Sequence, residues 1–467
     1  MRRRRGYGND RGSGSLWIVV LVILLAVGGY VFMSKSFERN APIVKSPDLI
    51  YWNRKDPLVL NVHDESELKS YEVKVTDGTN TITVANEMLL TPMNDKSIEV
   101  KYPKKAVDGV LLDPKAKKLQ LIVTVTDKSN WNFFQGNSVV KTINVYVDYK
   151  RPDINILSNS YSITKGGSAL VVFQVKDDKG LKSFFVKAGG KLFKAQPYKK
   201  EGYYAALLAW PFNVDSFTAD ITAEDMAGNK RVTNIPLYLL NKKYKVSWIQ
   251  AKDKFIDGKI ADLIDSEPKF STIDHRLEKL KAINETMRND NEVVINSLGK
   301  QVSSEVLDAW KIKKFYPLRN GAKVASFGDE RHYYYKDRNQ EVSQSYHLGL
   351  DLASTKMAMI VTSNPGTVVF DEYNGIYGNM PMIDHGLGLF TLYGHCSNVL
   401  VEKGQKVNAG DKIAQTGVSG LALGDHLHFG VLVQGNEVRP EEWMDSKWIR
   451  DNIDKVFKAA DKIIGSN

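Results

Sequence analysis

The sequence predicts a mostly β, multidomain chain that begins with one membrane-spanning helix. Three observations predict this fold class: a charge-free apolar run near the N-terminus, alternation of apolar and polar residues between positions 42 and 240, and helical spacing near position 270 before strand patterns return. A chain of 467 residues is also too long for one hydrophobic core.

The apolar run, Leu16–Met33, contains no charged residue. As a helix its eighteen residues would extend about 27 Å at 1.5 Å per residue, just enough to cross the hydrocarbon core of a membrane. A basic arm at residues 1–15 precedes it, so the arm should stay cytoplasmic and the chain after Ser34 should lie outside. A cleaved signal peptide, with a poor cleavage site at Ala26-Val27-Gly28, is the alternative. The long arm and long run favour an uncleaved anchor at residues 16–33.

The formal charge of +10 is partly local, because Arg2 to Arg5 and Arg11 all lie in the basic arm. The other lysines are scattered, which is typical of a solvated surface, although a weak attraction to a polyanionic wall or membrane is an alternative. The sequence has no basic-aromatic cluster and no nucleic-acid-binding fingerprint. Nucleic acid is therefore not an expected partner.

Short alternating strands separated by Gly, Asn and Asp turns predict antiparallel sandwiches. Clear examples of the alternation are Leu119, Leu121, Val123, Val125, Ile143, Val145, Val147, Phe217, Ala219, Ile221 and Ala223. A repeat with an offset of 113 relates Val62-His-Asp64 and Leu68-Lys-Ser-Tyr71 to Val175-Lys-Asp177 and Leu181-Lys-Ser-Phe184. We therefore predict two similar β-sandwiches, at residues 42–150 and 151–245. They loosely resemble the immunoglobulin-like modules of bacterial surface proteins, and they offer surfaces for protein partners.

Helical spacing follows the sandwiches. It is shown by Ile273, Leu277, Leu280, Ile283 and Met287. Ser271 with Asp274 forms a plausible capping box for this helix. We expect a helical connector at residues 250–312. A second amphipathic helix is predicted at residues 446–467, with an apolar stripe of Ile449, Ile453, Val456, Phe457, Ala460 and Ile463. This tail is expected to pack against the last domain rather than lie on a membrane.

The residues that carry chemistry lie between positions 347 and 428. In His347-Leu-Gly-Leu-Asp351, a straight strand would separate the two side chains by roughly 13 Å, so Gly349 is where the chain must bend if both bind one ion. His426-Leu-His428 places two imidazoles on one face of a strand, roughly 7 Å apart. His395 ends the segment Leu392-Tyr-Gly-His395 at the end of a predicted strand.

Two histidines and one carboxylate would leave one position of a zinc ion open, as in catalytic sites. Water in that position becomes more acidic and can attack a carbonyl group. Uncoordinated histidines have a suitable pKa for moving the proton. Four histidines and one aspartate thus divide into three ligands and two proton-transfer groups.

In this order the motifs resemble those of the lysostaphin/LytM-type zinc metalloendopeptidases, which are bacterial peptidoglycan hydrolases. The resemblance covers about residues 320–440. It includes Phe327-Gly328, His347-x3-Asp351, Gly366-x-Val, Tyr377-Gly-Asn, Ile383-Asp-His385-Gly, Tyr393-Gly-His395, Gly404-x-x-Val-x-x-Gly410 and His426-Leu-His428-Phe.

The resemblance implies an antiparallel-β peptidase domain, placed at residues 315–445, that binds one Zn²⁺. His347, Asp351 and His428 would be the zinc ligands. His395 and His426 would be the catalytic residues, and the resemblance does not decide which of them is the base.

For the whole chain the resemblance implies a D,D-endopeptidase-like enzyme that hydrolyses peptide cross-links of peptidoglycan. With the anchor, it places the enzyme on the bacterial inner membrane as a single-pass protein whose catalytic domain lies in the periplasm or outside the cell. A non-catalytic relative that binds wall peptides or activates an amidase is the alternative. A third possibility is a scaffold in which the sandwiches space, recruit or inhibit.

Several residues allow rival interpretations. The single cysteine, Cys396, follows His395 but is not favoured as a nucleophile, because the metal group accounts for the histidine. His385 is expected to be structural, and His332 to lie on a surface strand, with a groove wall as the alternative. Asp425 supports a metal ligand or simply forms a turn. The segment Val401 to Ile413 also looks like half of a lipoyl or biotinyl carrier, but an exposed hairpin lysine motif is missing.

Overall fold

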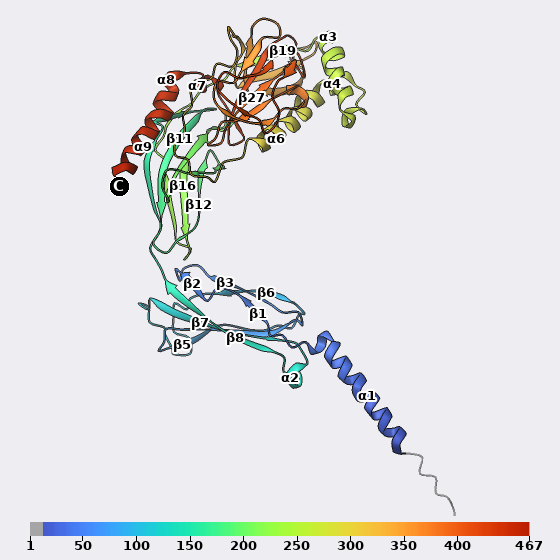
Figure 1. Ribbon diagram of the computed structural model, residues 1–467, viewed down its shortest axis with the longest axis vertical. Helices are drawn as coiled ribbons and strands as arrows, with labels where there is room; N and C mark the ends of the chain where they lie inside the picture. The colour runs from blue at the N-terminus through green and yellow to red at the C-terminus, as the bar shows by residue number, and fades with distance from the viewer. Residues whose placement is uncertain (1–12, 467) are drawn as a thin grey trace, which may run out of the picture. The chain divides into compact units, whose positions relative to one another are not determined.

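The computed structural model describes residues 13–466, and the chain is mostly β, as predicted (Figure 1). The described residues begin at position 13. Positions 1–12 of the predicted basic arm, which include Arg2 to Arg5 and Arg11, therefore lie outside them. By its contacts the chain divides into two compact units, residues 1–151 with 225–229 and residues 152–224 with 230–467. The finer domain boundaries given by the sequence stay a prediction.

The first unit begins with α1 (Ser13–Met33), which contains the whole charge-free run, and continues with η1 (Lys35–Phe37). Among the described residues α1 is the one helix long and apolar enough to cross a membrane. A membrane anchor and a signal sequence both fit this helix.

Two sheets share one core in the first unit, in strand orders β1-β3-β6 and β2-β8-β7-β4-β5. Their elements are β1 (Ile43–Lys45), β2 (Leu49–Trp52), β3 (Leu58–His63), β4 (Leu68–Thr76), β5 (Thr81–Met88), β6 (Asp95–Val100), β7 (Lys118–Asp127), the short α2 (Trp131–Phe134) and β8 (Ser138–Val147). The predicted alternation is confirmed in β7, where Leu119, Leu121, Val123 and Val125 are all buried.

The second unit begins with two further sheets, in orders β14-β15-β11-β9 and β13-β12-β16-β17, and a parallel pair β10-β18. Their strands are β9 (Asp153–Asn159), β10 (Ser162–Thr164), β11 (Ser168–Lys176), β12 (Leu181–Ala188), β13 (Lys191–Phe193), β14 (Gln196–Pro197), β15 (Tyr203–Ala209), β16 (Ala219–Asp225), β17 (Lys230–Asn234) and β18 (Tyr238–Leu240).

The sequence repeat corresponds to equivalent strands. β3 ends at His63 and β11 at Lys176, while β4 begins at Leu68 and β12 at Leu181, so both pairs keep the offset of 113. Asp127 Oδ1 accepts hydrogen bonds from two backbone amides in the turn after β7, and Asp225 Oδ1 does the same after β16. The two β-rich regions therefore share strand order and turn chemistry, and their likeness to immunoglobulin modules stays a prediction.

The predicted connector is helical between positions 253 and 298. Its elements are α3 (Asp253–Phe255), η2 (Ile256–Ile260), α4 (Ala261–Ser266), η3 (Pro268–Phe270), α5 (Arg276–Lys281), η4 (Ala282–Met287) and α6 (Arg288–Leu298). Its buried face packs with Met380, Met382 and Phe390 in one core.

The predicted capping box is wrong. The helix begins only at Arg276, and Ser271 Oγ donates to the Pro268 carbonyl at 2.7 Å instead of reaching a backbone amide of α5. Pro268 starts a short 3-10 turn, which uses Ser271 at its end rather than at a helix start.

The candidate site lies on an eight-stranded sheet. Seven of its strands follow the order β20-β23-β31-β27-β26-β25-β29, and the eighth, β32, pairs with β31. Two three-stranded sheets, β19-β21-β22 and β24-β30-β28, belong to the same region. The elements are β19 (Val246–Gln250), β20 (Ala322–Ala325), β21 (Asp329–Tyr334), β22 (Glu341–His347), β23 (Leu350–Ala353), β24 (Met359–Val361), β25 (Gly366–Phe370), η5 (Gly375–Tyr377), β26 (Met382–Asp384), β27 (Leu389–Gly394), β28 (Asn398–Val399), β29 (Lys406–Val407), β30 (Lys412–Gln415), β31 (Leu427–Val433) and β32 (Asn436–Val438).

The tail is helical through α7 (Pro440–Trp443), α8 (Ser446–Ile449), η6 (Arg450–Asp454) and α9 (Lys455–Ser466). Its buried stripe ends at Ile464, whereas Ile463, which the sequence assigned to the stripe, is 38% exposed. The tail lies along the sheet that contains β9 and β11. There the Tyr198 hydroxyl donates to Asp461 at 2.7 Å, and Ser160 Oγ donates to the Asn452 carbonyl at 2.9 Å. The tail was expected to pack against the last domain; it contacts that domain where Trp448 meets Trp443, with ring centroids 5.0 Å apart, but α9 lies on β9 and β11 of the second β-rich region.

Candidate metal centre and active site

His347 and Asp351 meet because the chain changes strands between them. β22 ends at His347 and β23 begins at Leu350, so Leu348 and Gly349 form the connection. The His347 Nε2 to Asp351 Oδ1 distance is 2.9 Å. A Cβ atom on Gly349 would lie 2.4 Å from His428 Nε2, so glycine is required by the close approach of this ring.

The pairing of β23 with β31 supplies the third member. Asp351 lies directly opposite His428 in the antiparallel register. His428 Nδ1 is 2.9 Å from Asp351 Oδ1 and 3.1 Å from His347 Nε2. Donor atoms of a tetrahedral site with bonds near 2.1 Å are about 3.4 Å apart, so this slightly more compact triangle fits such an ion. The three buried side chains can hold a metal ion through two nitrogens and one oxygen.

Local hydrogen bonds orient these groups as a metal ion would require. His347 Nδ1 lies 2.9 Å from the Ser326 carbonyl, which can only accept, so Nδ1 carries the proton and Nε2 keeps its lone pair toward the group. Burial disfavours the charge of Asp351, but His347 and His428 outweigh it and hold the pKa of this carboxyl well below its usual value. Burial lowers the pKa of His428 to about 4. Near neutral pH, Asp351 is therefore anionic and His428 is neutral, as metal ligands must be.

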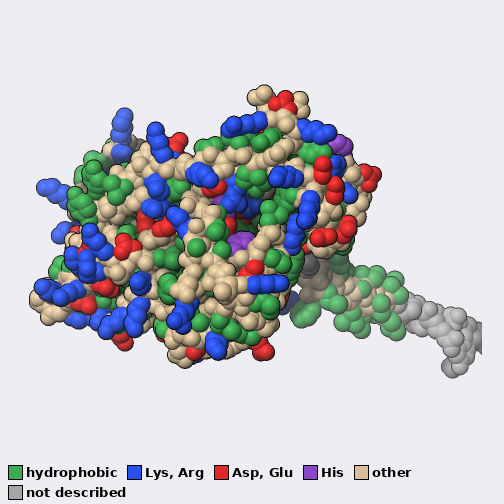
Figure 2. Space-filling model, turned by 90° about the horizontal axis from the view of Figure 1, so that it is seen from above, with side chains coloured by type: hydrophobic (Ala, Val, Ile, Leu, Met, Phe, Trp, Pro, Cys, Tyr) green, Lys and Arg blue, Asp and Glu red, His purple; other side chains and the backbone are tan. Residues whose placement is uncertain are grey.

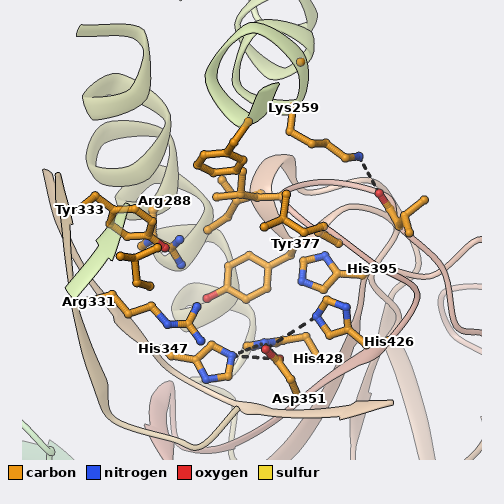
Figure 3. A pocket seen from close by; sticks show the side chains of 18 of the residues that line it. Lys259, Arg288, Arg331, Tyr333, His347, Asp351, Tyr377, His395, His426 and His428 are labelled. Carbon is orange, nitrogen blue, oxygen red and sulfur yellow. Dashed lines mark hydrogen bonds and ion pairs between the residues drawn. The ribbon is translucent and has the colours of Figure 1, made fainter. Parts of the chain in front are cut away.

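His395 and His426 flank this group (Figure 3). His395 Nδ1 lies 2.9 Å from the Ser419 carbonyl and His426 Nδ1 lies 2.7 Å from the Gly424 carbonyl. Each Nδ1 therefore carries its proton, and each Nε2 presents a lone pair. The ring centroids are 4.8 Å apart, and His426 Nε2 is 3.7 Å from Asp351 Oδ2.

His395 is held in an unusual backbone conformation. It follows the end of β27 with a φ of +66°, and its amide donates to the Tyr377 carbonyl at 2.7 Å. Non-glycine residues are uncommon in this region, and those that occur cluster at functional sites. Burial and the neighbouring His428 and His426 hold the pKa of His395 well below its usual value.

Two further residues of the motifs are buried and structural. His385 is fully enclosed, with Nδ1 2.8 Å from the Pro365 carbonyl and Nε2 2.8 Å from the Thr391 hydroxyl. Cys396 is also fully buried, its thiol contacts the Tyr393 carbonyl, and burial raises its pKa to about 12. A thiol that stays protonated and enclosed cannot serve as a nucleophile.

Asp425 and His332 both face away from the metal group. Asp425 accepts from the Thr416 hydroxyl and from the Met357 amide, which is 3.1 Å away, so it fixes the loop before β31. His332 stacks on Trp248, with ring centroids 4.6 Å apart, and contacts Glu341 at 2.7 Å. These contacts favour a turn role for Asp425 and a strand-surface role for His332.

A groove of about 890 Å³ opens over the five residues. Figure 2 looks into a hollow in which histidine lies between lysine and arginine side chains. The lining includes five cations, Lys252, Lys254, Lys259, Arg288 and Arg331, whereas Asp351 is the single acid among the described lining residues. Tyr333 and Tyr377 form part of the walls, and the Tyr377 ring lies edge-on to His428 with centroids 5.4 Å apart.

Sequence reasoning assigned none of the five cations to the site, although Tyr377 lies in one of the family motifs. Arg331 and Tyr333 lie two apart on β21 and share the groove face, while His332 between them points to the other face. Lys259 comes from η2, and its ammonium donates to the Val418 carbonyl at 2.7 Å across the groove (Figure 3). The period of β21 could have indicated Arg331, but no local signal brings the helical segment over the site.

Residues 345–440 match Peptidase family M23, so the chain contains an M23 peptidase domain of the LytM type. M23 is a metallopeptidase family. This match also includes the segment that resembled a lipoyl or biotinyl carrier.

Relatives of different function share this domain. The peptidoglycan DD-endopeptidase ShyA of Vibrio cholerae is 39% identical over 92 residues, which cover 20% of this chain and 21% of ShyA. The murein hydrolase activator NlpD of Salmonella dublin is 32% identical over 111 residues, which cover 23% of this chain and 29% of NlpD. The similarity thus spans less than a third of either relative. The solved catalytic domain of lysostaphin from Staphylococcus simulans covers 27% of this chain and 92% of its own, at 23% identity and a TM-score of 0.23.

Proposed function

We propose that this protein is a zinc-dependent endopeptidase that hydrolyses the peptide cross-links of peptidoglycan. The observation that carries the proposal is the buried triangle of His347, Asp351 and His428, whose donor atoms lie 2.9 to 3.1 Å apart. Two imidazoles and one carboxylate are the ligand set of catalytic zinc sites with an open fourth position. The similarity to a DD-endopeptidase supports the substrate class.

Bound zinc would supply a Lewis acid and an acidified water molecule. His395 and His426 would move the proton, because each holds Nδ1 to a backbone carbonyl and keeps the Nε2 lone pair free. Asp351 and Ser326 would hold the imidazole of His347 in one orientation. The buried floor would limit the access of bulk water to the reacting carbonyl.

The charge of the groove favours anionic peptides. The carboxylates of wall peptides would bind to the cations of the walls, which include Arg331 and Arg288 (Figure 3). Binding a carboxylate beside the scissile bond would orient the peptide across the floor of the groove.

We also propose that α1 is an uncleaved anchor in the bacterial inner membrane, with its N-terminus in the cytoplasm and the peptidase domain outside it. Its apolar run and the preceding arginines support this orientation. The predicted division into an anchor, two sandwiches, a helical connector and the peptidase domain at 315–445 is part of the same proposal.

The test measures bound zinc and the products released from purified peptidoglycan by the full chain in detergent. We expect one zinc per chain and cross-linked muropeptides cut between their peptide stems, as identified by mass. His428→Ala should lose both properties. His275→Ala, at an exposed histidine that precedes α5, is the matched control and should keep both.

A different outcome would assign the alternative function. The similarity to NlpD means that the same domain also occurs in a murein hydrolase activator. Bound zinc without any cleavage, together with a stimulated amidase, would replace the hydrolase proposal with an activating role.

A further inference from the structure

An exposed aromatic turn lies in the first unit, far along the chain from α1. This turn is α2, Trp131–Phe134, between β7 and β8. Phe133 is 92% exposed and Phe134 is 71% exposed. Two neighbouring phenylalanines with this exposure gain nothing from the core, and adjoining exposed aromatic rings are candidates for contact with a partner or a membrane.

The backbone of the turn is strained. Asn132, Phe133 and Phe134 have φ values of 53°, 55° and 68°, and only glycine adopts this left-handed region freely. Three such residues in sequence persist only where the surroundings impose them, which is typical of functional segments.

The turn contacts the segment that follows α1. The Asn130 amide donates to the Ser36 carbonyl at 2.7 Å, and Ser129 Oγ donates to the Glu38 carbonyl at 2.6 Å. The ring of Phe37, just after α1, contacts that of Phe134 with centroids 6.5 Å apart.

A cation joins the turn to α1 itself. The guanidinium of Arg39 lies 5.0 Å from the centre of the Phe32 ring in α1 and 4.3 Å from that of Trp131. Trp131 is therefore tied to a residue in the last turn of the apolar run, which ends at Met33. If α1 spans the bilayer, the turn lies at the level of its surface.

We propose that the Trp131–Phe134 turn inserts into the lipid interface beside α1 and fixes the first unit against the membrane. Tryptophan and other aromatic side chains favour this interface, and a cation near them suits lipid phosphates. Lipid is the expected occupant because the contacts with Phe32, Phe37 and Arg39 continue the apolar surface of α1. The inference rests on α1 as an anchor and is independent of the proposed peptidase activity.

The test places one nitroxide label on the full chain in vesicles of phosphatidylethanolamine and phosphatidylglycerol. The label is attached to Phe133→Cys in a Cys396→Ala background, which removes the native thiol. Thr79→Cys is the matched control, because it is exposed in the β4–β5 hairpin at the other end of the sheet. Nine strand residues separate the two ends, about 30 Å at 3.3 Å per residue.

The expected result is a several-fold higher ratio of oxygen to aqueous nickel-complex collision rates at position 133 than at position 79. Adding Phe134→Ser should lower the ratio at 133 toward the control. Equal ratios at both positions, with the chain still resistant to carbonate extraction, would overturn the proposal. Spin–spin broadening at 133 that disappears on dilution with unlabelled chain would assign the turn to a second copy and would overturn it as well.

Discussion

Gly349→Ala isolates the close approach that brings the metal group together. The added Cβ would lie 2.4 Å from His428 Nε2 and 3.0 Å from the Phe429 carbonyl oxygen, whereas ordinary contacts begin at 3.4 Å. The His428 ring must therefore move by about 1 Å, the difference between 3.4 and 2.4 Å. Metal–ligand distances tolerate roughly 0.2 Å, so a displacement of this size would remove one of the three proposed ligands.

We expect a large loss of zinc affinity and a moderate loss of folding stability. Disturbing even an indirect support of a ligand costs roughly 10- to 100-fold in metal affinity, so Gly349→Ala should weaken zinc binding by at least about 100-fold. Overpacking should destabilise the metal-free protein by about 1–3 kcal/mol. Zinc affinity is measured by chelator competition and stability by urea unfolding. Gly424→Ala is the matched control, since its Cβ would meet nothing within 4 Å. Zinc affinity equal to that of the unaltered chain would refute the close-approach reasoning.

Four other substitutions test different parts of the molecule. His395→Gln and His426→Gln should each lower kcat about 10²- to 10⁴-fold while zinc content stays at one per chain; loss of zinc in either variant would contradict their separation from the ligands. Arg331→Gln should raise KM for wall peptides with free carboxylates more than for amidated ones, and equal effects on both in steady-state assays would remove Arg331 from substrate binding. Glu442 is buried, and burial raises its pKa from 4.5 to about 7. Between these pH values Glu442 is protonated in the folded protein and ionised in the unfolded chain. The free energy of unfolding should therefore fall by roughly 3 kcal/mol as pH rises from 4.5 to 7. Glu442→Gln should flatten this slope in urea unfolding at a series of pH values, and an unchanged slope would assign the dependence elsewhere.

The repeat and the clustering of His347, Asp351 and His428 could be predicted from the sequence because local patterns determine them. Val62 and Val175 begin equivalent motifs at a fixed offset, and alternation alone identifies which side chains of β7 are buried. Gly349 marks the bend between His347 and Asp351, since no other residue fits between a turning strand and an approaching ring.

Two features of the helices differ from what the sequence patterns predicted. Ser271 and Asp274 satisfy the capping-box pattern, yet the turn that starts at Pro268 uses Ser271 before the helix begins. Ile463 and Ile464 are equally apolar neighbours, and only the sheet beside α9 decides which one is buried. The capping box was displaced by a local turn, whereas the buried side of α9 depends on tertiary packing, which overrides a local preference worth about 1 kcal/mol.

The groove shows why the family segment alone does not define the site. The metal group lies within residues 345–440, but Arg331, Arg288 and Lys259 come from β21 and from the helical segment outside it. The second β-rich region is also part of the same folded body, because the Ser168 amide donates to Glu442 at 2.9 Å and Trp443 packs in the core that both share. The family residues therefore supply the proposed metal ligands, while neighbouring segments supply the charge that would select a peptide. Two chains with the same five site residues can thus differ in substrate through walls that the family motifs do not contain.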